Sequence, residues 1–287
     1  MKKTKNTIIE IIIFMCGTLS VIFVVSIFIF LLKESLGFFR EYNILKFITG
    51  RNWYPDSNEP SFGIFPMVIG SFLVTFGACI IAVPIGVMAA LYISEIAPKY
   101  VHDILKFLVE LMATIPSVVI GLIGMCTIVP FVKNFFNIPT GLTAFSGSIM
   151  LAFMVMPTIV TISEDAIHSV PWKYREGALA LGATKWQAIR RIVLKEARPG
   201  IIAAIMLGIG RLIGETMAVM MITGNSASIP KSIFSPVRTM TATIAAEMGE
   251  VVKCDIHYKA LFAVGLVLFI ITFIVNFIAD FFLGKNK

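Results

Sequence analysis

The chain has 287 residues, of which 57% are hydrophobic and 14% are charged. Its mean hydropathy is +0.90, which excludes an ordinary soluble domain and indicates an integral membrane protein. The net charge of +7 is therefore read first as a sign of membrane topology, and we expect no nucleic-acid partner.

The four cysteines and three histidines form no recognisable ligand set. The cysteines lack CxxC spacing, and three of them lie in apolar stretches, which favours small core side chains over disulfides. The histidines are far apart in the sequence. We therefore expect neither a metal site nor a cofactor.

The first apolar stretch covers residues 8–32 and follows three lysines. It is long enough to cross about 30 Å of hydrocarbon. A secretory signal has the same charged start, but no small-x-small cleavage site follows this stretch. We expect residues 1–33 to form a tail and an uncleaved first span. Residues 34–63 are expected to form an extracytoplasmic segment, with aromatic side chains such as Phe38 and Trp53 at the headgroup level.

Five further apolar stretches predict an all-α bundle of six transmembrane spans, with residues 64–284 as its core. Three of these stretches contain an internal proline, namely Pro84, Pro116 and Pro157, and each proline is expected to kink its helix. The five predicted spans are 64–94, 105–132, 147–162, 201–223 and 261–283.

Basic residues are denser in the segments that contain the N-terminus, the C-terminus and the 164–199 loop. The positive-inside rule assigns such segments to the cytoplasm. We therefore expect a multi-pass membrane protein with both termini and this loop on the cytoplasmic side.

The 164–199 loop is the longest polar interruption on that predicted side. Residues 173–181 are rich in helix formers, and Gly182 is expected to end their helix with a positive φ. Thr184 and Gln187 fit a capping box that begins a second helix. This helix has an apolar stripe with basic residues on both sides. The stripe consists of Trp186, Ile189, Ile192 and Val193.

The loop is expected to end at Pro199, which can open the next span at its first helical position. A helix, a glycine turn and a basic helix admit two functional interpretations besides a solvated linker. One is a DNA-binding helix-turn-helix, and the other is a docking element for a cytoplasmic partner. About 35 polar residues between two spans are too few for the core of a DNA-binding domain.

Arg211 lies about 16 Å into the predicted fifth span, near the middle of the hydrocarbon. A charge at this depth is costly and needs a reason. Glu215 is one turn further along the predicted helix, so the two side chains can pair. The pair is either a structural contact or a charged station for an anion, with Glu215 orienting the arginine.

The sequence has no G-x-x-x-x-G-K-S/T loop to hold nucleotide phosphates. The glycine-rich run that begins at Gly208 lies in a span and lacks the lysine. We therefore expect that this chain is not an enzyme.

The loop resembles the signature of ABC importer permeases, which reads EAA, three residues, G, nine residues and I-x-L-P. Here Glu176-Gly177-Ala178 precedes Gly182 and then Ile192-Val193-Leu194 with the same spacing, although Gly177 and Lys195 depart from the pattern. In that family the loop docks in a cleft of the ATPase subunit. The resemblance implies this coupling role for Glu176, Gly177, Ala178, Gly182, Trp186, Ile192 and Leu194.

The run GRLIGETMAV, which begins at Gly210, is similar to the fifth span of phosphate-specific transport permeases. Further similar runs begin at Gly63, Ile115 and Ala246, and the extra first span favours the C-type subunit. The resemblance implies a type I, MetI-like fold in a bacterial cell membrane and a role for Arg211 and Glu215 in phosphate passage. The implied partners are an A-type permease subunit, two ATPase subunits, an extracytoplasmic phosphate-binding protein and inorganic phosphate.

Two alternatives remain open from the residues alone. Arginine does not distinguish phosphate from molybdate, sulfate or phosphonate, so the chain can be a permease for another oxyanion. An ion-coupled secondary carrier is a different class, and the coupling loop and the lack of a visible inverted repeat argue against it.

Overall fold

The computed structural model describes residues 2–253 and 255–284, and in these residues the protein is almost entirely helical. This confirms the predicted all-α class. The long elements are α1 (Lys2–Glu41), α3 (Phe65–Leu91), α4 (Lys99–Thr114), α7 (Ala144–His168), α10 (Leu194–Gly214) and α13 (Ile256–Gly284). The shorter helices are α2 (Ile44–Thr49), α5 (Ser117–Cys126), α6 (Ile128–Phe136), α8 (Trp172–Ala180), α9 (Lys185–Ala188), α11 (Met217–Ile222) and α12 (Met240–Glu247). Two π-helical turns, η1 (Tyr92–Ile96) and η2 (Ile189–Val193), and a hairpin of β1 (Trp53–Tyr54) and β2 (Ser61–Phe62) complete the fold.

Five helical segments within the described residues are long and apolar enough to cross a membrane. They are Glu10–Glu41, Phe65–Ile96, Ser117–Phe136, Ala144–His168 and Ile256–Ala279. The predicted fifth span, 201–223, is divided into α10 and α11, and α10 begins among charged residues that lower its hydropathy. The total of six spans therefore stays a prediction.

The predicted span 105–132 is wrong as a single helix. Ile115 and Pro116 are extended, with ψ values of 125° and 140°, so α4 ends and α5 begins on either side of them. The reason is that a proline disfavours the helical conformation of the residue before it. In contrast, Pro84 and Pro157 lie inside α3 and α7, which continue past them.

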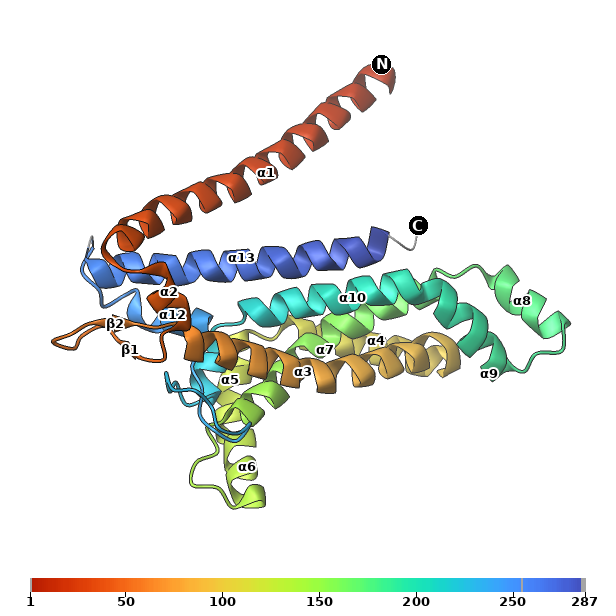
Figure 1. The fold of residues 1–287 in the computed structure, drawn as a ribbon. Coiled ribbons are helices and arrows are strands. Elements are labelled where there is room, and N and C mark those ends of the chain that lie inside the picture. Colours follow the sequence, from red (N-terminus) through yellow and green to blue (C-terminus); the bar gives the residue numbers. More distant parts are fainter. Residues whose placement is uncertain (1, 254, 285–287) are drawn as a thin grey trace.

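The core is built around α7, with α3 and α10 packed on it (Figure 1). Ile159 of α7 lies between a glycine from each neighbour. A Cβ atom at Gly86 would lie 2.9 Å from Ile159 Cγ2, and one at Gly208 would lie 3.0 Å from Ile159 Cγ1. Glycine at these two positions therefore lets both helices approach α7 closely.

A second core lies where α1 and α13 meet α2, the hairpin and α12. Phe28 and Phe30 of α1 pack against Phe269 and Phe262 of α13. Phe38 is fully buried and Trp53 is only 3% exposed, so both rings face the protein interior, and their depth in the membrane stays a prediction. The burial is tertiary, since both rings pack against the buried ring of Phe62. The Trp53 Nε1 also donates a hydrogen bond to Glu247 of α12 at 3.0 Å.

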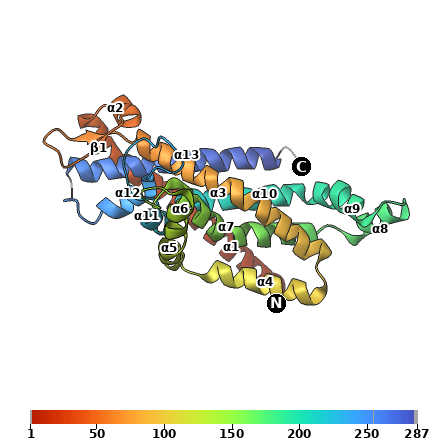
Figure 2. The same cartoon turned by 90° about the horizontal axis from the view of Figure 1, so that it is seen from below.

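Different helices and strands lie at the two ends of the elongated molecule. The start of α1, the end of α13, α8 and α9 all lie toward one end (Figure 1). The hairpin, α2 and α12 lie toward the other end, and Figure 2 gives the same division from a second direction. If the core spans the membrane, the start of α1, the end of α13 and the loop helices α8 and α9 lie toward the same side of it.

This arrangement generates a topology prediction. In a chain without its four native cysteines, a membrane-impermeant thiol reagent added to intact cells should label Asp56→Cys and Lys231→Cys, both of which are exposed positions. Lys185→Cys, also exposed, should react only after the membrane is permeabilised, because the basic residues favour a cytoplasmic loop. Labelling of position 185 in intact cells would reverse the topology.

Candidate functional site

The 164–199 loop folds as two short helices joined at Gly182. The φ of Gly182 is +82°, which confirms the predicted left-handed cap after α8. The capping box at the start of α9 is also confirmed. The backbone N–H of Gln187 donates to Thr184 Oγ1 at 3.3 Å, and the Thr184 N–H donates to Gln187 Oε1 at 2.9 Å.

Pro199 does not open a helix at its first position, so that prediction is wrong. The chain stays helical from α9 through η2 into α10, and Pro199 lies inside α10. A proline costs one backbone hydrogen bond, and membrane helices tolerate this loss better than soluble helices do. The second helix of the loop and the start of the predicted fifth span therefore form one continuous helix.

The predicted coupling residues divide between two faces of the loop. Glu176, Gly177, Gly182 and Trp186 are exposed, and Trp186 is 55% exposed. Ala178 is buried, and Ile192 and Leu194 are half-buried. The predicted apolar stripe is divided in the same way, since Ile189 and Val193 pack into the core. The loop therefore presents an outward face with an exposed tryptophan and a carboxylate, and an inward face that fixes it to the bundle.

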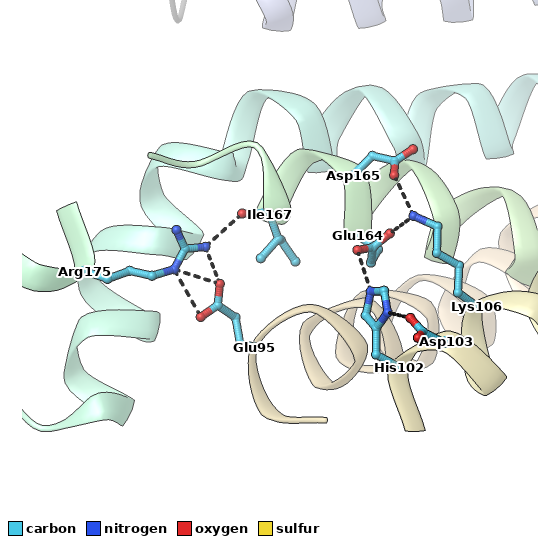
Figure 3. Close-up of polar contacts among 8 residues, drawn as sticks. All are labelled: Glu95, His102, Asp103, Lys106, Glu164, Asp165, Ile167 and Arg175. Atoms are coloured by element: carbon cyan, nitrogen blue, oxygen red, sulfur yellow. Dashed lines mark hydrogen bonds and ion pairs between the residues drawn. The ribbon is translucent and has the colours of Figure 1, made fainter. Parts of the chain in front are cut away.

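The structure contains two clusters of polar side chains near this loop that no sequence pattern indicated (Figure 3). In the first, Arg175 of α8 forms an ion pair with Glu95 of η1, and both side chains are less than a tenth exposed. Arg175 is the residue before the EAA-like motif, but its partner is 80 positions away, and no local pattern links the two.

In the second cluster, Glu164 of α7 is buried, and its carboxylate contacts two side chains of α4, Lys106 and His102. Its Oε2 accepts a hydrogen bond from Lys106 Nζ at 2.7 Å, and its Oε1 lies 3.5 Å from His102 Nε2. Lys106 also donates to Asp165 at 3.1 Å. These contacts fasten α4 to α7 beside the loop.

The hydrogen bond to Asp103 raises the pKa of His102 above its usual value, and Glu164 adds to this effect while burial opposes it. Asp103 Oδ1 lies 3.0 Å from His102 Nδ1. The imidazolium form of His102 is therefore favoured by carboxylates on both sides of the ring.

Arg211 is exposed on α10, and its Nη1 donates a hydrogen bond to Thr158 Oγ1 of α7 at 2.9 Å. Glu215 does not share its helix. The helix ends at Gly214, and Glu215 is extended with ψ 131°. Glu215 Oε1 instead accepts the Ala218 N–H at 3.3 Å. The predicted i,i+4 pair is therefore wrong, because the helix on which it depended is interrupted at Glu215.

Hydroxyl groups surround the interruption at Glu215. Thr241 Oγ1 donates to the Glu215 carbonyl oxygen at 2.9 Å. A narrow cavity beside Glu215 is also lined by Ser71, Thr75 and Thr239. These hydroxyl side chains come from α3 and from the start of α12, which are far apart in the sequence, so the sequence did not indicate that they meet at Glu215.

The chain belongs to the family described as the binding-protein-dependent transport system inner membrane component, which matches residues 82–285. The probable ABC transporter permease protein YqgH of Bacillus subtilis is 36% identical over 274 residues, covering 95% of this chain and 89% of the relative. The phosphate transport system permease protein PstC of Mesorhizobium japonicum is 34% identical over 256 residues, covering 83% of this chain and 77% of the relative. The chain is thus a multi-pass permease component of a membrane transport system.

Solved structures share the fold. The bacterial alginate ABC transporter, in complex with its alginate pentasaccharide-bound periplasmic protein, has a chain with a TM-score of 0.62 and 15% identity, covering 93% of this chain and 92% of that one. A chain of the inward-facing MetNI methionine ABC transporter has a TM-score of 0.58 and 20% identity, covering 78% and 94%. These likenesses confirm the predicted importer-permease fold and extend to the fold alone.

The raised pKa of His102 gives a pH prediction with a definite sign. A group whose folded-state pKa is raised contributes stability below its unfolded-state pKa, and this contribution is lost as pH rises through the folded-state pKa. We expect the unfolding temperature of the purified chain to fall between about pH 6 and pH 8, and His102→Gln to flatten this decline. Differential scanning fluorimetry measures both curves. His168→Gln, at an exposed histidine, should keep the decline, and an unchanged decline in His102→Gln would contradict the assignment.

Proposed function

We propose that this chain is the transmembrane permease subunit of an ATP-driven phosphate importer, and that Arg211 meets the anion on its path. The proposal is based on the exposure and the hydrogen-bond partner of the Arg211 guanidinium. It is exposed and held by Thr158, and it is not neutralised by Glu215. A guanidinium has five N–H donors in a planar fork that matches an oxyanion.

The surroundings of Arg211 and the relatives support phosphate as the cargo. Hydroxyl side chains also line the narrow cavity beside Glu215, four residues along the chain from Arg211. Relatives at 32–34% identity are named phosphate transport system permease proteins. Another oxyanion is the second candidate, since a guanidinium alone does not separate tetrahedral anions.

In this proposal the loop faces the cytoplasm and docks in an ATPase subunit, which hydrolyses the ATP. Trp186 and Glu176 lie on the exposed face of the loop, available to a partner, and an amphipathic helix that lies in a groove is a common docking mode. Two ATPase subunits, an A-type permease subunit and an extracytoplasmic phosphate-binding protein complete the transporter. ATP closes the ATPases, the loop moves with them, and the bundle alternates between outward and inward access.

The Arg211 role is tested with Arg211→Gln. Uptake of radiolabelled phosphate by cells or proteoliposomes should fall by about a hundredfold or more, because a charge-assisted contact with the anion is removed. The amount of ATPase that co-purifies should stay the same. Exchange of the two charges, Arg211→Glu with Glu215→Arg, should not restore uptake, because the positive charge is moved away from the proposed anion contact and the two side chains bond to other partners. Normal uptake by Arg211→Gln would remove Arg211 from the mechanism.

The matched control is Arg40→Gln, at an exposed arginine in the last turn of α1 and outside the loop, which should retain uptake. Competition separates the alternatives for the cargo. Excess unlabelled phosphate should block uptake, whereas excess sulfate or molybdate should not. Uptake that persists with vanadate and depends on an ion gradient would instead indicate a secondary carrier.

The docking role is tested with Gly182→Val. A β-branched residue is strained at a φ of +82°, which costs about 1 kcal/mol or more locally and misplaces α9. We expect phosphate uptake per ATP hydrolysed to fall while the chain still inserts. Gly249→Val, at a glycine with open space around its Cβ position, is the control. Unchanged uptake per ATP in Gly182→Val would contradict docking through this loop.

A further inference from the structure

The buried ion pair between Arg175 and Glu95 joins the loop to the end of α3. Arg175 Nε donates to both carboxylate oxygens of Glu95, at 3.1 and 3.3 Å, and its Nη2 donates to Oε1 as well. The Arg175 side chain is 9% exposed and that of Glu95 is 8% exposed. This is the geometry of a forked, charge-assisted contact, which orients both partners.

The same guanidinium also holds the exit of α7. Its Nη1 donates to the Val170 carbonyl oxygen at 2.5 Å, and Nη2 donates to the Ile167 carbonyl oxygen at 3.1 Å. Its Cζ lies 5.4 Å from the centre of the Trp172 ring. Figure 3 shows the Arg175 side chain reaching from α8 to Glu95 and Ile167. One side chain therefore contacts α8, η1 and the end of α7 together.

Direct packing of α8 on η1 is slight, although Ile93 of η1 shares an apolar cluster with Val193 of η2. The main contacts of α8 are with α9 and η2. A cavity of about 550 Å³ is lined by Ser94 and Glu95 on one side and by α8 and α9 residues such as Leu179 and Lys185 on the other. The ion pair lies at this cavity, so it is the direct connection through which a displacement of α8 reaches η1.

We propose that Arg175 is a positioning residue that makes the end of α3 follow α8, so that the state of the docked ATPase reaches the bundle through Glu95. This inference rests on the proposed function, because it assumes a cytoplasmic ATPase at the loop. It adds a second route from the loop into the bundle, besides the continuous helix from α9 into α10. Arg175 and Glu95 lie outside the outward docking face.

A purely structural pair predicts a different mutational pattern. Arg175→Gln or Glu95→Gln leaves one buried charge without its partner, which disturbs folding whatever the role of the pair. The double variant Arg175→Gln with Glu95→Gln buries no unpaired charge. A structural role therefore predicts that the double variant recovers transport. A positioning role predicts that it assembles normally but remains uncoupled.

The experiment uses the complex purified with its ATPase, from a chain without the four native cysteines. Spin labels are placed singly at Leu181→Cys beside α8, a position 90% exposed, and at Tyr92→Cys in η1, a position 43% exposed. In the parent chain, ATP with vanadate should change the mobility of both labels. In the double variant the label at 181 should still respond and the label at 92 should not. Radiolabelled phosphate carried per ATP should fall about tenfold.

Asp165→Asn is the matched control, because it removes an exposed carboxylate from the neighbouring cluster and leaves Lys106 on Glu164. Both labels should respond in it, since exposed ion pairs contribute little. A full response at 92 in the double variant, or normal phosphate carried per ATP, would overturn the link between Arg175 and Glu95. An ATPase that fails to co-purify with the parent chain would contradict the proposed function itself.

Discussion

The close approach of α3 and α10 to α7 is the constraint on which the rest of the structure depends. Ile159 fills the space between Gly86 and Gly208, so the three helices are held at a separation that no larger residue permits at either glycine. In a lipid environment, packing of this kind replaces the hydrophobic effect as the force that holds helices together. It places η1, at the end of α3, and η2, before α10, next to the end of α7.

Buried and partly buried charged side chains form contacts toward both ends of the part of the chain that the structure describes. Glu95 pairs with Arg175, and Glu164 pairs with Lys106. At the other end, Glu247 accepts from Trp53 and Arg238. Burial of a charge is tolerated when such partners are in place. These contacts connect α4, α8 and the hairpin to other elements of the fold.

Arg211 is different, because its side chain is exposed on α10 with a threonine hydroxyl as partner. The helix that carries it is continuous, through η2 and α9, with the exposed Trp186. The face proposed to dock a partner and the side chain proposed to meet an anion therefore lie on one rod. A movement of that rod changes the environment of Arg211 without any separate hinge at Pro199.

Much of the fold could be predicted from the sequence, because hydropathy and helix-capping patterns are local. The apolar stretches indicated a helical membrane protein, the Gly182 turn needed only glycine chemistry, and the capping box needed only Thr184 and Gln187. The roles of the loop and of Arg211 were inferred from motifs and stay predictions. Where local rules were ambiguous, they failed. Pro116 separates two helices, while Pro199 lies within one, and the difference depends on neighbouring elements.

By itself, then, the sequence determined the all-α class, the membrane setting and the two-helix loop, since each follows from the periodicity or chemistry of adjacent residues. Tertiary structure alone decided that Arg175 meets Glu95, that Lys106 meets Glu164, and that Arg211 meets Thr158 rather than Glu215. The physical reason is that these partners are 80, 58 and 53 positions apart. Their meeting depends on how closely helices approach and where they end, and no spacing along the chain encodes either.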